Sequence, residues 1–320
     1  MTIARMLFAC LVALLLPASG VLAQTAFPAQ IVKIVVPFSA GSNTDILARI
    51  LADKLGGLWK QTVIVENKPG ITGTISVANS PADGYTLMLT SNGHTILSSL
   101  NKDLSIDPIA SFAGVAEVAS VPLVLIVAPE VQANNLKEFV ALAKANPGKM
   151  NFASAGLASS NYIAGELLKQ TAAIDIVHIP YRGTPEQLTS LMRGDAQLSM
   201  AFLGTALSFI QSGKVRAVAI ATPQRNPALP DVPTFAESGM SEYKYDSWFG
   251  MMAPAKTPGP ILKKVSDDIA AVMKDPEVQK RLETLGAVPV GNSPEQFDAI
   301  IRADADRYSK LLKAAGITPK

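Results

Sequence analysis

Thiols and imidazoles are scarce in this sequence. Of its 320 residues, one is cysteine and two are histidine. The cysteine, Cys10, lies in an N-terminal apolar segment that we expect to be removed, so the mature chain would carry no thiol. This excludes disulfide bonds, thiolate metal sites and cysteine nucleophiles, and it suits an oxidising compartment. Two histidines without cysteine also argue against a zinc site, and nothing calls for a cofactor.

Charge is also sparse, at 17% of residues with a formal net charge of +2. No stripe of lysine and arginine with interleaved aromatic residues is visible, so we expect no nucleic-acid partner. Beyond the N-terminal segment no apolar stretch approaches the ~20 residues of a membrane-spanning helix, and we expect a soluble mature chain. Its length suffices for two lobes of ordinary domain size. Nothing in the sequence calls for an oligomer, and we expect a monomer.

The first 23 residues have the pattern of an export signal. Arg5 is followed by an apolar run over 6–16 and by a small-residue cleavage pattern at 21–23, which predicts cleavage between Ala23 and Gln24. The apolar run, about eleven residues long, is too short for a spanning anchor. Residues 7–10 look like a lipoprotein box, but such a box should follow the apolar run and this one precedes it. We therefore predict a periplasmic location.

Short β-rich runs alternate with helical ones, which is typical of an α/β fold. The expected strands are residues 31–37, 62–66, 85–90, 121–128, 150–154, 174–179, 197–202, 215–221 and 248–253. Helices are expected to begin near residues 44, 135, 160 and 184, and a helical C-terminal tail covers 258–273, 276–285 and 294–315. Residues 222–240 are rich in Pro, Asn and Asp and are predicted to form a loop.

Two such α/β series with a returning segment favour two lobes joined by two crossovers. We expect residues 24–124 and 225–320 to form one lobe and residues 125–224 the other. The crossovers are predicted near 123–128 and 222–245. A hinge between two lobes is a common architecture for closing on a ligand.

Two predicted strand-to-helix loops, 37–45 and 154–160, share one design. Small residues allow a ligand to approach the backbone, and hydroxyls and free amides at a helix N-terminus favour a carboxylate or phosphate. One loop falls in each lobe, so the two can face each other across a cleft. The alternative is that both are only well-capped turns, with Thr44 or Asp45 as the N-cap. The candidate ligand-binding residues are Phe38, Ser39, Gly41, Ser42, Asn43, Thr44 and Asp45, together with Ser154, Gly156, Ser159 and Ser160.

Two further polar loops follow predicted strands, where open α/β sheets bind ligands. The first contributes Ser91, Asn92 and His94, although a loop-stabilising role for His94 is an equal alternative. The second contributes Tyr181 as a possible wall and Arg182 as a bidentate partner for a ligand carboxylate. A solvated Arg182 beside a packed tyrosine is the alternative. Trp248 is a minor pocket candidate.

The motifs of common enzymes are missing: there is no His-Glu-x-x-His, Walker loop or Gly-x-Gly-x-x-Gly after a strand. One partial match is Phe152-Ala153-Ser154-Ala155-Gly156, with Asp175 and His178 following in the order of a serine hydrolase. However, Ala153 replaces the first glycine, and His178 comes only three residues after Asp175. We therefore predict a binding protein, with a secreted hydrolase based on Ser154 as the alternative.

Several motifs resemble the Bug-type solute receptors, the periplasmic receptors of tripartite tricarboxylate transporters. In order they are VPFSAG (36–41), VENKPG (65–70), PADGYTL (81–87), ANPGK (145–149), HIPYRG (178–183), LPDVPT (229–234) and SWFG (247–250). The resemblance implies a two-lobed periplasmic binding protein fold, type II-like. It also implies that the two loops hold a carboxylate of a small acid, which is passed to a multi-pass membrane transporter. Docking on a sensor protein is a further alternative.

Three positions depart from the family pattern. Ser42 replaces a usual glycine, Ala201 a frequent aspartate and Tyr162 a common histidine. The last two exchanges remove ionisable polar groups, so we expect a preference for a less polar acid, such as an aromatic one, over a free amino acid. We also expect Ser39→Ala and Ser154→Ala each to weaken binding without unfolding the protein.

Overall fold

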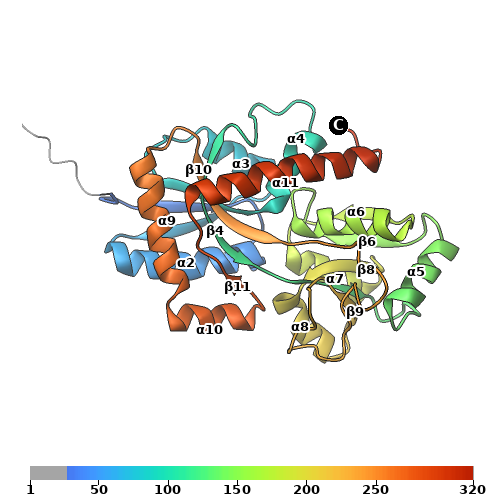
Figure 1. The fold of residues 1–320 in the computed structure, drawn as a ribbon. Coiled ribbons are helices and arrows are strands. Elements are labelled where there is room, and N and C mark those ends of the chain that lie inside the picture. Colours follow the sequence, from blue (N-terminus) through green and yellow to red (C-terminus); the bar gives the residue numbers. More distant parts are fainter. Residues whose placement is uncertain (1–26, 320) are drawn as a thin grey trace, which may run out of the picture.

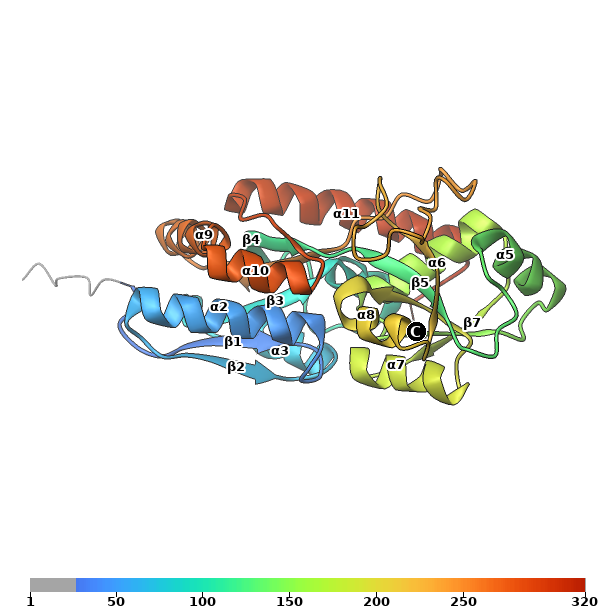
Figure 2. The same cartoon turned by 90° about the horizontal axis from the view of Figure 1, so that it is seen from below.

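The computed structural model describes residues 27–319. The predicted export segment, with Cys10 and the cleavage point after Ala23, lies outside these residues. The described chain forms two mixed β-sheets, each with helices packed on it, and the two groups lie side by side (Figures 1 and 2). We call these groups the first and second lobes. The expected α/β architecture with two lobes is confirmed.

The sheet of the first lobe has six strands in the order β11-β4-β10-β3-β1-β2. Strand β1, which lies between β3 and β2, is apolar except for Lys33 because both of its faces are largely buried. Ile34 and Val36 pack in the core beneath α2, whereas Val35 faces Val77 of α3. The strands are β1 (Val32–Val36), β2 (Val63–Asn67), β3 (Thr86–Ser91), β4 (Phe112–Ser120), β10 (Trp248–Pro254) and β11 (Val288–Pro289).

The helices of the first lobe come from both halves of the chain. They are α2 (Asn43–Trp59), α3 (Ile71–Ala78), the 3-10 helix η1 (Asn92–Ile96), α4 (Leu97–Leu100), α9 (Gly259–Met273), α10 (Pro276–Thr284) and α11 (Pro294–Ala314). The predicted C-terminal helices are confirmed, and Ser293 and Gln296 form a full capping box at the start of α11.

The sheet of the second lobe has five strands in the order β7-β6-β8-β5-β9. Alternate residues of the apolar strand β5 face two cores: Leu125 points to one cluster and Ile126 to the other. The strands are β5 (Leu123–Val127), β6 (Asn151–Ser154), β7 (Val177–Pro180), β8 (Leu198–Phe202) and β9 (Arg216–Ile220), and the helices are α5 (Leu136–Ala145), α6 (Ser160–Ala172), α7 (Thr184–Arg193) and α8 (Leu203–Gln211).

The chain passes between the sheets twice, at adjacent places. The predicted strand 121–128 is interrupted at its start, because Pro122 has no amide hydrogen to continue a ladder. β4 therefore ends at Ser120 in the first sheet and β5 begins at Leu123 in the second. The return passes through Ser247, whose carbonyl accepts from Val121 N at 3.2 Å and whose hydroxyl donates to Val121 O. The two crossovers are thus bonded to each other.

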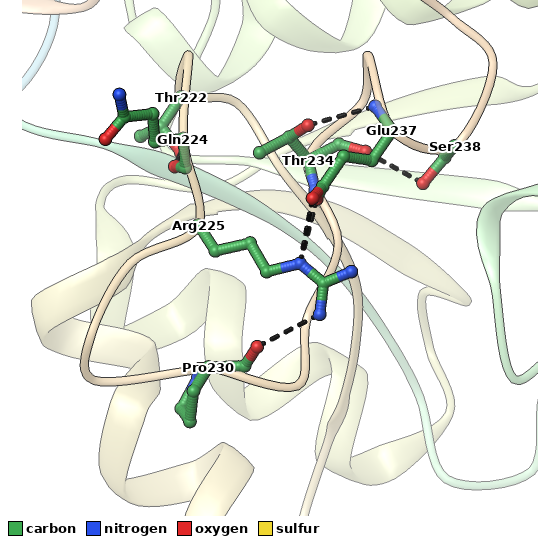
Figure 3. Close-up of polar contacts among 7 residues, drawn as sticks. All are labelled: Thr222, Gln224, Arg225, Pro230, Thr234, Glu237 and Ser238. Carbon is green, nitrogen blue, oxygen red and sulfur yellow. Dashed lines mark hydrogen bonds and ion pairs between the residues drawn. The ribbon is translucent and has the colours of Figure 1, made fainter.

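The connection from β9 to β10 spans residues 222–247 without a helix or strand, and hydrogen bonds within the segment stabilise it (Figure 3). Residues 222–240 of this segment were predicted to form a loop. Arg225 Nε lies 3.1 and 2.9 Å from the two carboxylate oxygens of Glu237, and its Nη1 donates to Pro230 O at 3.2 Å. Thr234 forms a bridge to Ile220 at the edge of the second sheet. As domain limits, the predicted boundaries at 124 and 225 stay a prediction.

Helix α11 reaches from the first lobe onto the second (Figure 1). Gln170 Nε2 of α6 donates to the carbonyl of Leu311 at 2.6 Å, and Leu312 is packed in the core with Leu168. The C-terminal end of the tail therefore contacts both groups of elements.

Six elements were not predicted from the sequence: β4, β11, α3, α4, α8 and η1. β4 contains Gly114 and Glu117, which break the apolar pattern, and α8 begins directly after β8 with no loop signal. Helix α3 is short and begins at a glycine without a side-chain cap. Within residues 27–319 no helix is long and apolar enough to cross a membrane, and no group of acidic or histidine side chains is arranged to hold a metal ion.

Candidate functional site

A small cavity lies between the lobes, at the ends of the strands that the sequence singled out. Its volume is about 10 Å³, roughly what one water molecule requires, so a larger ligand can enter only when the lobes separate. The lobes touch closely around it: a Cβ added to Gly93 would overlap the Ala158 carbonyl, and one added to Gly183 would overlap Ser39. The lining residues are Phe38, Ser42, Asn43, Thr44, Ser91, Ala155, Ser159, Ser160, Asn161, Thr184, Phe202 and Phe249.

Three helix N-termini converge on the cavity: α2 from the first lobe, and α6 and α7 from the second. Ser42 and Ser159 cap α2 and α6 through their side chains, whereas Gly183 precedes α7 without a side-chain cap. The first amides of a helix have no acceptor within the helix, and the helix dipole adds partial positive charge there. The cavity therefore gathers amide donors from three helix ends, and its lining contains no charged side chain. The sequence predicted all three helix starts, but it assigned only the first two to the ligand site.

Several buried polar atoms near the cavity have no partner among the described residues. They are both amide atoms of Asn43, the hydroxyl of Ser91 and the side-chain oxygen of Asn161. Asn43 is 1% exposed and Asn161 is fully buried. Leaving a buried polar group without a hydrogen bond costs about 1–3 kcal/mol, and native proteins rarely tolerate several such groups together. These groups are matched to a polar guest such as a carboxylate with its associated water.

The remaining wall is aromatic. Phe202 ends β8 and Phe249 lies in β10, and their ring centroids are 5.0 Å apart. Phe38 closes another side of the cavity. Acidic side chains are absent from the lining, so the site offers dipoles for an anion and apolar surface for the rest of the molecule.

A wider groove of about 370 Å³ adjoins the cavity, and Phe38 and Ala155 line both. It collects three of the predicted residues, Gly156, Tyr181 and Arg182. Arg182 is exposed, and its backbone carbonyl accepts from Ser39 N of the first lobe at 3.3 Å. The other groove residues are mostly apolar: Pro37, Pro69, Gly70, Ile71, Leu97, Asn101, Leu157, Ala158 and Pro180.

Asp45 shapes the first loop without lining the cavity. Its carboxylate accepts from Gly41 N at 2.9 Å, Arg49 Nε at 3.1 Å and Asn67 Nδ2 at 2.9 Å. Burial raises the pKa of Asp45, but these hydrogen bonds outweigh it and hold the pKa below its usual value. The loop is thereby fixed around an ionised carboxylate. Gly41, which donates one of these bonds, has a positive φ of 77°, a conformation that glycine adopts without strain.

Five other predicted residues are absent from the lining of the cavity and of the groove: Ser39, Gly41, Asn92, His94 and Ser154. His94 is 1% exposed, its Nε2 lies 2.7 Å from Pro108 O, and its ring packs edge-on against Phe112. The structure therefore supports the loop-stabilising alternative for His94, because its ring is committed to the core of the first lobe. Asn92 and Ser154 are likewise engaged in internal hydrogen bonds.

The serine hydrolase alternative has one matching feature and two conflicting ones. Ser154 Oγ lies 2.7 Å from His178 Nε2. However, Ser154 is fully buried, and burial lowers the pKa of His178 to about 3, which makes it a poor general base near neutrality. Among the described residues no hydrogen bond joins the exposed Asp175 to His178. The arrangement is a packed structural pair.

Of the three positions that depart from the family pattern, only Ser42 reaches the cavity. Tyr162 is buried against Phe152 and His178, and Ala201 packs in the apolar cluster between β8 and α7. Trp248 lies in the first-lobe core, with its Nε1 donating to Asp304 at 2.7 Å. The residues at positions 162 and 201 therefore give no reason to expect a less polar acid. Apolar surface for such a ligand comes instead from Phe202 and Phe249, which line the cavity.

Comparison with known proteins identifies the family and the fold. Residues 47–317 match the profile of the family described as "Tripartite tricarboxylate transporter family receptor". The solved structure of the periplasmic binding protein BugD is 34% identical, with a TM-score of 0.85, covering 92% of this chain and 100% of that one. An R. palustris protein solved with adipate is 30% identical, with a TM-score of 0.86 over 92% and 100% of the two chains.

MatC from Rhodopseudomonas palustris, solved with bound malate, is 29% identical, with a TM-score of 0.83 over 89% of this chain and 100% of that one. Family and fold alike are those of solute-binding proteins. The chain therefore belongs to the receptor family of the tripartite tricarboxylate transporters.

Proposed function

We propose that this chain is a periplasmic solute-binding protein that captures a small carboxylate between its lobes and delivers it to a tripartite tricarboxylate-type membrane transporter. The relatives solved with adipate and malate support a carboxylate ligand, and the predicted export signal supports the location. N-terminal sequencing of the secreted protein should show Gln24 as its first residue.

The observation that carries this proposal is the set of unpartnered polar atoms on Asn43, Ser91 and Asn161, placed where three helix N-termini meet. A carboxylate bound there accepts hydrogen bonds from Asn43 Nδ2, the Ser91 hydroxyl and the free backbone amides, and a water that enters with it donates to the amide oxygens of Asn43 and Asn161. Hydrogen bonds to a charged group in such surroundings are stronger than those between neutral groups. Binding thus satisfies groups that the closed protein otherwise buries at a cost.

The residues that line the cavity and the groove determine which ligands we expect. Neither the cavity nor the groove presents a carboxylate, so the ammonium group of a free amino acid would lose water without gaining a partner. The aromatic wall and the apolar groove suit a hydrocarbon body. At the mouth of the groove, Arg182 can pair with a second carboxylate. We therefore propose aliphatic dicarboxylates and aromatic acids as the ligand class.

The test measures the melting temperature of protein purified from the periplasm after expression of the full chain. The protein is first unfolded, dialysed and refolded to remove retained ligand. Adipate, hexanoate, benzoate, terephthalate, malate and glutamate are then added separately, with adipamide as an uncharged match for adipate. A ligand at one hundred times its Kd stabilises the native state by about 2.7 kcal/mol.

We expect shifts with adipate or the aromatic acids, a smaller one with glutamate and none with adipamide. A larger adipate than hexanoate shift would support the second carboxylate contact at Arg182. A refolded protein that responds to none of these acids would contradict the binding role, and a preference for glutamate would contradict the proposed class.

A further inference from the structure

Asn92 uses every hydrogen-bonding position of its side chain. Its Oδ1 accepts from Ser160 Oγ at 2.5 Å and from the Tyr245 hydroxyl at 3.1 Å. Its Nδ2 donates to Asp246 O at 3.1 Å and to the Tyr308 hydroxyl at 3.5 Å. A side-chain amide can accept two hydrogen bonds and donate two, so none is left for a ligand. Asn92 is fully buried.

Of these four bonds, the one from Ser160 joins parts of the molecule that must move relative to one another if the lobes open. Asn92 begins η1 in the first lobe, and Ser160 begins α6 in the second. Tyr245 and Asp246 belong to the crossover that returns to β10. The single hydroxyl hydrogen of Tyr245 is shared between Asn92 Oδ1 and the backbone carbonyl of Ser160, which lies 2.9 Å away, so the hydroxyl contacts both lobes. Separation of the lobes breaks the bond between Asn92 and Ser160 and leaves Tyr245 with one lobe only.

The same residues adjoin the cavity in sequence. Ser91, next to Asn92, and Asn161, next to Ser160, both line the cavity and carry unpartnered oxygens. A carboxylate that accepts from the Ser91 hydroxyl and reaches Asn161 Oδ1 through a bridging water therefore holds Asn92 and Ser160 near bonding distance. Burial raises the pKa of the Tyr245 hydroxyl well above its usual value, so that the group stays a hydrogen-bond donor at all physiological pH values.

We propose that Asn92, Ser160 and Tyr245 form a closure latch, in which Asn92 and Tyr245 are positioning residues that stabilise the closed lobes without contacting the ligand. The inference rests on the proposed binding function, because closure serves capture. A ligand that prefers the closed state binds in proportion to how often the protein is closed. The latch residues thereby change the apparent affinity for the ligand although they do not contact it.

The chain offers a matched pair of variants. Tyr245→Phe removes the hydroxyl that bonds to both lobes. Tyr243→Phe, on the same crossover, removes a buried hydroxyl that donates only to Ala164 O of the second lobe at 2.9 Å. Each substitution deletes one oxygen from a buried tyrosine, so a general loss of packing should affect both alike. Thermal unfolding of each variant verifies that it folds.

The measurement is the distribution of distances between spin labels on the two lobes. Labels are placed at Lys144→Cys on α5 and Lys274→Cys after α9, both exposed positions, in a Cys10→Ala background so that no other thiol is present. Distances are recorded without added acid and with adipate, and the adipate dissociation rate is measured on the unlabelled proteins.

Without acid, Tyr245→Phe should lower the closed-to-open ratio about fivefold, as expected for the loss of one buried hydrogen bond. It should also speed adipate dissociation, while Tyr243→Phe leaves both quantities within about twofold of the parent protein. Equal distributions in all three proteins, equal shifts in both variants, or an open parent protein would each overturn the latch. The acid-free distances decide this even if adipate binds to none of the proteins, a result that would count against the proposed function instead.

Discussion

The two loops that face each other across the cleft have nearly the same composition but use their polar groups differently. In the first loop, Ser42 caps α2 and both amide atoms of Asn43 remain without partners beside the cavity. In the second loop, Ser154 bonds to His178 and to Gly156, and Ser159 donates to Gly156 O at 2.6 Å. The second loop reaches the cavity through Ala155 and through its helical end at Ser159, Ser160 and Asn161.

This difference shows that the presence of hydroxyls in a strand-to-helix loop does not by itself identify ligand contacts. What matters is whether the loop consumes its own donors and acceptors. The first loop is held in shape by Asp45, which lies outside the lining and frees the neighbouring groups for a guest. The second loop is held by Ser154 itself. Matched substitutions in the two loops should therefore affect binding and stability in opposite proportions.

The largest effect is expected at Asn43. Asn43→Ala removes two unpartnered buried polar atoms, so stability should change little or rise, while the bound carboxylate loses a hydrogen-bond donor. Hydrogen bonds to charged groups are worth about 1.5–3 kcal/mol, so we expect the Kd for adipate to rise about 10- to 100-fold. Isothermal titration calorimetry measures the Kd, and thermal unfolding gives the stability. An unchanged Kd would remove the start of α2 from the site.

At Ser154 we expect the reverse, a larger effect on stability than on binding. Ser154→Ala deletes the hydroxyl that pairs with His178 at 2.7 Å and leaves the cavity lining untouched. We expect a loss of about 1 kcal/mol of stability and a Kd for adipate within about threefold of the parent value. Urea unfolding and calorimetry together test this. A large loss of affinity with full stability would restore Ser154 to the ligand contacts, as the sequence alone had suggested.

Most of the fold could be predicted because its strands are short apolar runs bounded by turn residues, and its helices begin at clear caps such as Asn135 and Ser293. The first crossover was placed a few residues late, since an apolar run from Val121 to Ala128 reads as one strand. Only the position of Pro122 shows that the run is divided. β4 was missed because neighbouring strands on both sides, β10 and β11, stabilise a segment whose own pattern is weak.

The site was predicted as far as local signals allow. Loop composition and helix starts identified Ser42, Asn43 and Ser160 correctly as lining residues. Phe202 and Phe249 were missed because each is a buried aromatic residue in a strand, and only the closure of the two lobes turns these positions towards one cavity. His94 and Asn92 show the reverse error, since a polar loop residue can serve the core or a contact between lobes.

The smallest expected effect is a dependence of stability on pH. It compares the lining of the cleft with Glu117 and Asp304, which lie in the first lobe outside that lining. The lining of the cleft contains no aspartate, glutamate or histidine side chain. On the first lobe, by contrast, burial and the nearby charges of Asp304 and Asp246 raise the pKa of Glu117 to about 7. Burial also raises the pKa of Asp304 to about 6, partly offset by its hydrogen bond from Trp248 and the charge of Arg307. Stability should therefore depend on pH where binding does not.

The direction of this pH dependence follows from the number of protons that the folded and the unfolded chain bind. Between its usual pKa of 4.5 and its folded value of about 7, Glu117 keeps a proton in the folded chain that the unfolded chain has released. Its contribution to stability is thus fully present below pH 4.5 and is lost as the pH rises through 7. His94 and His178, whose pKa values burial lowers to about 4 and about 3, act in the opposite direction below pH 6.5. The informative quantity is therefore the difference between the parent protein and Glu117→Gln.

Glu117→Gln keeps an oxygen for Asn292 but cannot ionise, so it should gain stability relative to the parent protein as the pH rises from 5 to 8. Because water reaches part of this carboxyl group, we expect a gain of about 1 kcal/mol, less than the shift in pKa alone would imply. Urea unfolding at each pH measures it, and calorimetry with adipate should give the same Kd at pH 6 and pH 8 for both proteins. A Kd that changed with pH only in the parent protein would show that the charge of Glu117 acts on closure, so that the two regions are coupled.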